Sequence, residues 1–284
     1  MTIALEAPPK RRELRRSKPK SLRVIAVWGS PGSGKSTIAL NLATELSAKK
    51  LKVLLIDADT HNPSQTTALA ITDHPAGLAP MLRFARQSRL QPKEFDSQSM
   101  VLKSGRSSFT LIPGINPTRW PEVTPQAFEL LVEHASTVFD FVVIDCSSAI
   151  EPNLYSQAHP LPRNEFTRWL LKTAELVIAT FAVDPVSMAR FLSAEPELQE
   201  LRESKPIILV ANRLRNSTLG PAAKLQVEQT FKKLTHRKVD AFLPNDPKAQ
   251  DASLRNGTPL IAARRGSALR KAIAQLVRDK KLAG

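Results

Sequence analysis

A loop rich in Gly, Ser and Pro joins an apolar run to a helical pattern in the stretch VIAVWGSPGSGKSTIALNLATEL, residues 24–45. Residues 29–36 fit the spacing G-x-x-x-x-G-K-[ST], with the apolar strand before it and the helix after it that this motif requires. The glycines let the backbone turn tightly, so that successive N–H groups point inward beside a helix N-terminus and form an anion site. The motif therefore predicts a strand–loop–helix unit that holds a nucleoside triphosphate.

The rest of the chain alternates short apolar runs with longer helical patterns. Strands are predicted at 23–28, 52–57, 109–112, 140–145, 176–182, 206–211 and 241–243. Helices are predicted at 35–49, 78–88, 124–137, 165–174, 186–203, 221–234, 247–255 and 267–281. Near-continuous apolar strands separated by helices indicate a mostly parallel sheet with helices on both faces. We therefore predict one doubly wound α/β domain over residues 22–284, after a disordered basic leader at residues 1–21.

Most of the net charge of +15 lies at the two ends of the chain. Residues 1–23 carry eight basic and two acidic side chains and residues 254–284 carry eight and one, which leaves +2 for residues 24–253. Clustered basic ends favour a polyanionic partner, either DNA bound without sequence preference or an anionic membrane contacted peripherally. The alternative is a solvated leader and an ordinary terminal helix that packs its apolar stripe on the sheet.

Composition argues against several other classes of protein. No apolar run approaches the roughly 18 residues of a membrane span, and the N-terminus lacks the apolar stretch of a signal peptide, so we expect a cytoplasmic protein without an integral membrane segment. The single cysteine, Cys146, is expected to be a core thiol. The histidines have no ligand spacing, so no transition-metal site is predicted.

Acidic residues follow two of the predicted strands. The segment VLLIDAD places Asp57 and Asp59 at one strand end, and FDFVVIDCSS places Asp145 at another. In an open sheet of this type, the functional site lies at the carboxyl ends of the strands. A buried strand that ends in Asp packs poorly unless the carboxylate faces a site. Together with Lys35, which can reach the phosphates, and the Ser36 hydroxyl, they predict a site for a magnesium-bound nucleotide.

These features resemble the MinD/ParA group of P-loop ATPases. The matching segments, in family order from about residue 23 to 280, are the phosphate loop, VLLIDAD, VVIDCSS, AVDPVSMARF, ILVANR and LPNDPKAQDASLRNGTPL. The single-domain layout looks closest to the CpaE/TadZ-like branch, which is linked to pilus assembly and to partition-like proteins.

The resemblance implies ATP and Mg²⁺ as cofactors and assigns roles by position. Lys35 and Asp59 would be catalytic, with Asp59 positioning the attacking water, and Ser36, Asp57 and Asp145 would hold the metal, the two carboxylates through its water shell. The implied nucleotide contacts are Gly29, Ser30, Pro31, Gly32, Ser33, Gly34, Lys35, Ser36 and Thr37 in the loop, and Asn212, Arg213 and Pro244 around the adenine.

One position departs from the family pattern. The family usually has a second lysine directly after the first glycine of the loop, which reaches across an ATP-sandwiched dimer, and here this residue is Ser30. We therefore expect a weak ATPase that acts as a spatial or assembly switch in partitioning, septum or pilus positioning, with an unidentified protein partner. A homodimer on ATP binding is the family's behaviour, and Ser30 counts against it.

Two alternatives are open. The first is a nucleotide-responsive scaffold that binds ATP and DNA or a protein but hydrolyses little. The second arises because DADTHNPS is also similar to bacterial tyrosine kinases, which have Arg where this chain has His61. Those kinases phosphorylate a C-terminal tyrosine cluster, whereas this chain has only Tyr155, so the kinase alternative is disfavoured.

Overall fold

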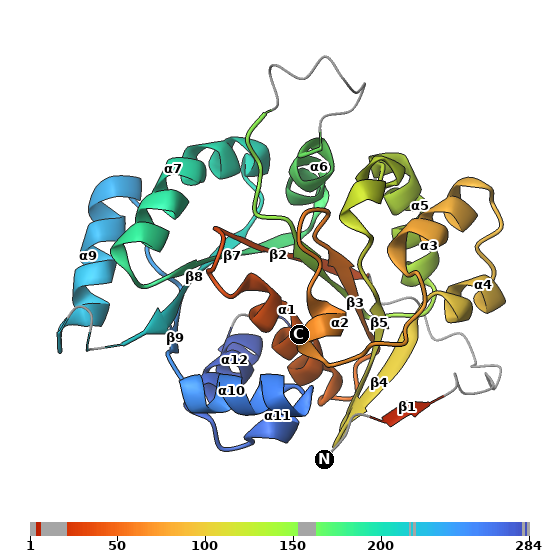
Figure 1. Ribbon diagram of the computed structural model, residues 1–284. Coiled ribbons are helices and arrows are strands. Elements are labelled where there is room, and N and C mark those ends of the chain that lie inside the picture. The colour runs from red at the N-terminus through yellow and green to blue at the C-terminus, as the bar shows by residue number, and fades with distance from the viewer. Residues whose placement is uncertain are drawn as a thin grey trace.

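The computed structural model describes residues 4–6, 22–152, 163–215, 217, 220–279 and 282. Nine strands form one sheet in the order β1-β4-β5-β3-β6-β2-β7-β8-β9 (Figure 1). Their bounds are Ala4–Glu6 (β1), Arg23–Gly29 (β2), Val53–Ala58 (β3), Met100–Ser104 (β4), Ser107–Ile112 (β5), Phe141–Cys146 (β6), Leu176–Ala182 (β7), Ile207–Leu214 (β8) and Ala241–Pro244 (β9). The strands from β5 to β9 in this order are parallel, and β4 and β1 pair antiparallel at one edge.

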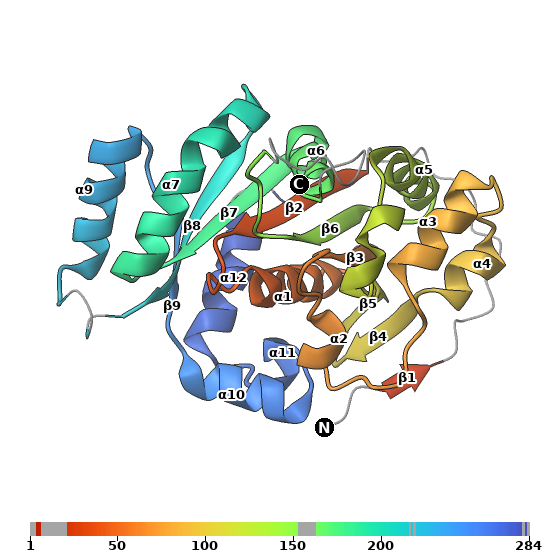
Figure 2. The ribbon, with the colours of Figure 1, turned by 45° about the horizontal axis from the view of Figure 1, so that its top comes forward.

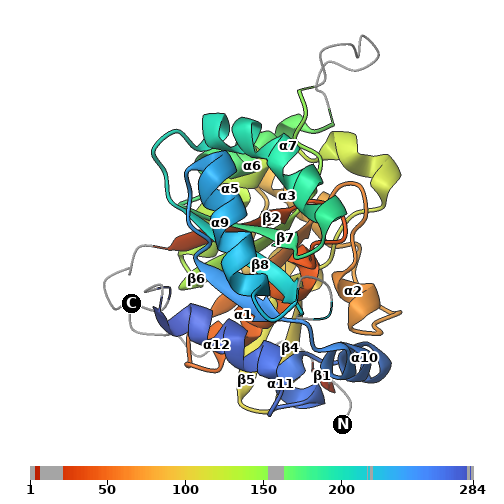
Figure 3. The same ribbon diagram turned by 90° about the vertical axis from the view of Figure 1, so that its left-hand side faces the viewer.

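Helices cover both faces of the sheet. Their bounds are Lys35–Ser47 (α1), Gln65–Ala68 (α2), Leu78–Arg86 (α3), Pro92–Ser97 (α4), Pro117–Glu122 (η1), Pro125–Ser136 (α5), Glu165–Thr173 (α6), Pro185–Arg202 (α7), Ala223–Thr235 (α9), Pro247–Asn256 (α10), Leu260–Ala263 (α11) and Ala268–Asp279 (α12). Figures 2 and 3 show α3, α5, α6, α7 and α9 on one side and α1, α10, α11 and α12 on the other. This arrangement confirms the predicted doubly wound α/β fold.

Each face has its own apolar core because alternate residues of a strand point to opposite faces. In β2, Ala26 and Trp28 pack under the helices from α3 to α9, whereas Ile25 and Val27 pack under α1 and α12. The strands are therefore buried on both sides, which is why they appear in the sequence as continuous apolar runs.

The terminal helix packs its apolar stripe on the protein. Leu269, Ile273, Leu276 and Val277 of α12 are at most 3% exposed and lie in the core beside α1. The packing alternative for this segment is therefore confirmed. Cys146 is fully buried, as expected for a core thiol, and burial raises its pKa. Among the described residues, no helix is both long and apolar enough to cross a membrane.

The predicted elements all form, with ends within a few residues of those expected, but several short elements were not predicted. Strand β4 completes an antiparallel hairpin with β5, and α2, α4, α11 and η1 are short turns of helix. Strand β1 lies within the predicted disordered leader. The rest of that leader, including its basic residues from Lys10 to Lys20, lies outside the described residues, as does Tyr155.

Candidate active site

The phosphate-loop segment runs from the end of β2 to the first residue of α1. Gly32 and Gly34 have positive φ angles of 78° and 87°, in the left-handed region that favours glycine. A Cβ atom on Gly34 would lie 2.4 Å from Nδ2 of Asn212, and one on Gly29 would lie 2.2 Å from the carbonyl oxygen of Thr180. The loop thus fits tightly against β7 and β8, and its glycines are required by both conformation and space.

Three carboxylates meet the loop at the ends of the central strands. Asp57 of β3 is paired in register with Asp145 of β6, and Asp59 follows β3 directly. All three are nearly inaccessible to solvent, with 1%, 0% and 3% exposure for Asp57, Asp145 and Asp59. Nζ of Lys35 lies 2.6 Å from Oδ2 of Asp59 and 3.7 Å from Oδ1 of Asp145. One ammonium group therefore faces three buried carboxyl groups.

The imbalance of charge appears in the pKa values. Burial, followed by the charge of Asp145, raises the pKa of Asp57 to about 7, and burial also raises the pKa of Asp145. Burial likewise acts to raise the pKa of Asp59, but the charge and hydrogen bond of Lys35 outweigh it and lower that pKa. Burial acts to lower the pKa of Lys35, yet the charges of Asp145 and Asp59 raise it to about 12. The site is short of positive charge.

The residues predicted for the metal fit a magnesium ion. Oδ1 of Asp145 is buried and has no hydrogen-bond partner among the described residues. Hard oxygen donors of this kind suit Mg²⁺, which keeps several of its waters and binds one or two carboxylates together with substrate phosphates. In the described part of the chain, no three His, Cys, Asp or Glu side chains converge as direct ligands would. Ser36 would hold the ion directly and Asp57 and Asp145 would hold it through its waters, and the ion would neutralise phosphate charge there.

Several residues in this network were not predicted from the sequence. The Gln65 amide donates to Oδ2 of Asp145 at 2.7 Å and to the carbonyl of Ser36 at 3.1 Å, so it ties the metal carboxylate to the loop. The hydroxyl of Ser147 donates to Oδ1 of Asp59 at 2.8 Å and lies 3.0 Å from Nδ1 of His61. Nothing in the sequence pattern marks these contacts, because each joins residues 29 to 88 positions apart.

A cavity of about 400 Å³ opens beside the lysine and Asp59. Its lining comes from the loop, from the segment after β3 and from the segment after β6: Pro31, Gly32, Lys35, Asp59, His61, Asn62, Ser148, Ala149 and Glu151. This volume lies within the range of small-molecule sites. The cavity places the phosphate loop, the carboxylate predicted to act on water, and an unpredicted histidine around one space.

The predicted base-binding residues lie at the ends of β8 and β9. Asn212 is only 3% exposed, and its Nδ2 donates to the carbonyl of Ser33 at 2.8 Å, so its amide supports the phosphate loop. Arg213 has a positive φ of 57° and borders a second cavity of about 210 Å³ with Asn245, the residue after Pro244. Arg213 and the segment from residue 244 are thus brought together, and adenine recognition here stays a prediction.

The side chain of Ser30 points into the interior of its own chain. It is 4% exposed, and its Oγ lies 3.3 Å from Oγ of Ser187, near the start of α7. Ser187 in turn accepts a hydrogen bond from the backbone N–H of Ala182 at 2.9 Å. The position after the first glycine therefore links the loop to α7 of the same chain.

Comparison with known proteins identifies the family of the chain. The family model described as CbiA: CobQ/CobB/MinD/ParA nucleotide binding domain matches residues 24–260. The chain belongs to this family. The septum site-determining protein MinD of Synechocystis sp. is 24% identical over 238 residues, which cover 84% of this chain and 81% of that protein.

Solved structures of a ParA family ATPase and of a MinD protein share the fold. A ParA family ATPase from Chlorobium tepidum TLS is 21% identical with a TM-score of 0.72, covering 90% of this chain and 99% of that one. The septum site-determining protein MinD of Pyrococcus horikoshii OT3, solved with Mg-ADP, is 19% identical with a TM-score of 0.68, covering 93% and 98%. That relative's ligand is a magnesium-bound adenine nucleotide.

Proposed function

We propose that this protein is an ATPase that binds Mg-ATP, hydrolyses it slowly and acts as a spatial or assembly switch. The observation that carries the proposal is the grouping of Lys35 with Asp57, Asp59 and Asp145 at the phosphate loop. A site with more buried carboxylates than cations attracts Mg²⁺, and backbone N–H groups of a glycine-rich loop at a helix N-terminus attract phosphate. Membership of the CbiA family supports the same chemistry.

The residues of the site would have different roles in binding Mg-ATP. Lys35 would leave Asp59 for the β- and γ-phosphates, Ser36 would contact the metal directly, and Asp57 and Asp145 would hold its waters. Gln65 keeps Asp145 in place, and Asn212 keeps the loop closed. Hydrolysis of ATP then depends on positioning and electrostatics more than on covalent chemistry.

We propose weak turnover because Ser30 replaces the family's second lysine. The hydroxyl of Ser30 faces Ser187 of the same chain. Because serine carries no positive charge, Ser30 offers no cation to the nucleotide of a partner subunit. An ATP-dependent homodimer therefore stays a prediction that this position disfavours. The cytoplasmic location, the assignment to the CpaE/TadZ-like branch, and the process served (partitioning, septum or pilus positioning) are likewise proposals. A pulldown with ATP and with ADP would identify the protein partner.

A non-catalytic scaffold is the competing proposal, and Asp59→Ala separates the two. We expect the variant to bind Mg-ATP at near wild-type affinity but to lose turnover, because the positioning of water matters in the transition state more than in the ground state. Phosphate release and calorimetry measure the two quantities. A wild-type protein that binds ATP without releasing phosphate would favour the scaffold, and equal loss of binding and turnover in the variant would make Asp59 a structural residue.

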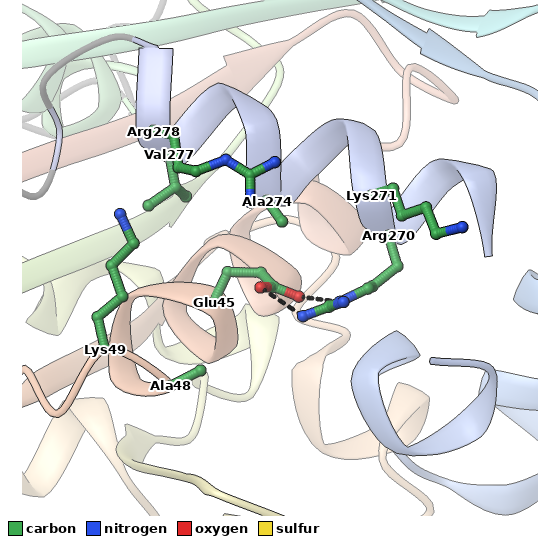
Figure 4. A pocket seen from close by; sticks show the side chains of 8 residues that line it. All are labelled: Glu45, Ala48, Lys49, Arg270, Lys271, Ala274, Val277 and Arg278. Atoms are coloured by element: carbon green, nitrogen blue, oxygen red, sulfur yellow. Dashed lines mark hydrogen bonds and ion pairs between the residues drawn. The ribbon is translucent and has the colours of Figure 1, made fainter. Parts of the chain in front are cut away.

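The basic C-terminal segment supports the proposal of a polyanionic partner such as DNA. Figure 4 shows Lys49 of the segment after α1 beside Val277 and Arg278 of α12, with Lys271 at the far end of the same cavity of about 140 Å³ and pointing away from it. Arg270 is bound to Glu45 by two hydrogen bonds of 2.5 and 3.0 Å, so its charge is already paired. The other cations around this cavity have no carboxylate partner among the described residues.

A further inference from the structure

The carboxylate of Asp59 is held by four donors, three of them on one oxygen. Its Oδ2 accepts from Lys35, and its Oδ1 accepts from the backbone N–H groups of His61 and Asn62 at 3.0 and 2.9 Å and from the Ser147 hydroxyl at 2.8 Å. Oδ1 carries three donors on its two lone pairs and is fully occupied, whereas Oδ2 has a free site once Lys35 turns to the phosphates. Oδ2 can therefore accept one hydrogen of an attacking water, and a second group in the cavity can accept the other.

His61 offers such a group in the same cavity. Its Nδ1 lies 3.0 Å from Oγ of Ser147, whose single hydrogen is directed to Asp59. Because a serine hydroxyl has only one hydrogen, Ser147 must accept from His61, which places the ring proton on Nδ1. In the neutral ring, Nε2 then carries the lone pair, and Nε2 has no hydrogen-bond partner within the described part of the chain.

The charges around His61 favour the neutral ring. Burial lowers its pKa, and the positive charges of Arg163 and Lys35 act in the same direction, while Asp59 and Glu151 oppose them. Arg163, from the segment before α6, is held near the ring by a hydrogen bond of 2.6 Å to the carbonyl of Thr60. A neutral imidazole beside a phosphate site is a suitable general base near neutral pH.

We propose that His61 accepts the proton of the attacking water that Asp59 positions, and that Ser147 is the positioning residue that fixes the tautomer of His61. This role rests on the proposed ATPase function. The water oxygen bonds to the γ-phosphorus, the bond from that phosphorus to the β–γ bridging oxygen breaks, and its electron pair leaves with ADP. The water proton passes to Nε2 of His61 and returns to solvent or to the phosphate after the step.

The test uses His61→Phe, which removes the acceptor, and His61→Gln, which keeps a polar group that binds water but takes no proton. We expect both to bind Mg-ATP within about twofold of wild type and to lose about 100-fold or more in single-turnover rate. The hydrolysis rate of the wild type should decrease at pH values below the pKa of His61. The rate of His61→Gln should not show this decrease. His74→Gln, which alters an exposed histidine before α3, is the matched control and should leave the rate unchanged.

A second readout does not depend on activity. Nitrogen-15 NMR of the nucleotide-free protein should show His61 protonated on Nδ1, and Ser147→Ala should shift the tautomer away from Nδ1–H. A wild-type ring protonated on Nε2, or a wild-type hydrolysis rate in His61→Phe, would overturn this role alone. Absence of turnover in the wild type would overturn the proposed function and this role with it.

Discussion

Replacing Asp145 by Asn should stabilise the nucleotide-free protein at alkaline pH, although it removes a residue of the site. Asp145 is fully buried, and its Oδ2 accepts a hydrogen bond from Gln65. Asn has the same size and keeps an oxygen for that bond. The substitution removes one of three buried carboxylates that share one lysine, and its charge is a main cause of the raised pKa of Asp57.

The size of the effect follows from the pKa of Asp57, which is about 7 in the fold against an ordinary value of 3.8. Between these values the native state holds a proton that the unfolded chain has released, so the free energy of unfolding falls as the pH rises. The slope for one such proton is about 1.4 kcal/mol per pH unit, or about 4 kcal/mol over the window. That is a large part of the roughly 5–15 kcal/mol of a typical domain.

We expect Asp145→Asn to raise the free energy of unfolding by about 1–3 kcal/mol at pH 8, and by much less near pH 4, where Asp57 holds its proton in the wild type. Urea unfolding followed by circular dichroism, with a chelator and without nucleotide, measures this from pH 4 to pH 8. Asp251→Asn, which alters an exposed carboxylate of α10, is the control and should show no such pH dependence. The reasoning would be refuted by a variant less stable than wild type at pH 8. It would also be refuted if the difference in free energy of unfolding between variant and wild type did not change with pH.

Three further predictions concern ligands. Lys35→Ala should weaken ATP binding tenfold or more, about 1.4 kcal/mol, in calorimetry, and an unchanged affinity would contradict the phosphate-loop assignment. Ser30→Lys should raise the ATP-dependent dimer fraction in sedimentation once the side chain leaves Ser187, whereas no change would mean that the interface itself has diverged. Duplex DNA should bind without sequence preference, with a slope of log affinity against log salt near −3 to −4 if half of one basic cluster engages. Neutral substitutions of the basic residues from 10 to 20 should flatten that slope, and no DNA binding at low salt would leave the charge without this role.

The central elements could be predicted because their signals are local. Buried parallel strands appear as continuous apolar runs, and Asp184 and Asp246, each followed by Pro, cap α7 and α10 as the sequence alone would indicate. Strand β4 was missed because only alternate residues of MVLKS are fully buried, which gives a weak signal over so short a run. The four-residue helices α2 and α11 are fixed by tertiary contacts and have too few residues to show a period.

The site was predictable only as far as its motifs reach. Lys35, Asp57, Asp59 and Asp145 follow strands and glycines that mark them. Gln65, Ser147 and Arg163 act through hydrogen bonds to residues 80 to 103 positions away, and no single-sequence pattern records which residues the fold brings together. The buried orientation of Ser30 toward Ser187 belongs to the same class, because the two residues are 157 positions apart.

Strand β1 affects how an N-terminal truncation of this protein would be interpreted. It pairs with the outer side of β4 at the end of the sheet (Figure 1). A chain that lacks residues 1–21 would therefore leave the N–H and C=O groups on the outer side of β4 without their partner. A bare strand of this kind recruits strands from other molecules and promotes aggregation. Self-association or weak DNA binding of such a truncated protein would therefore report a damaged sheet rather than lost charge.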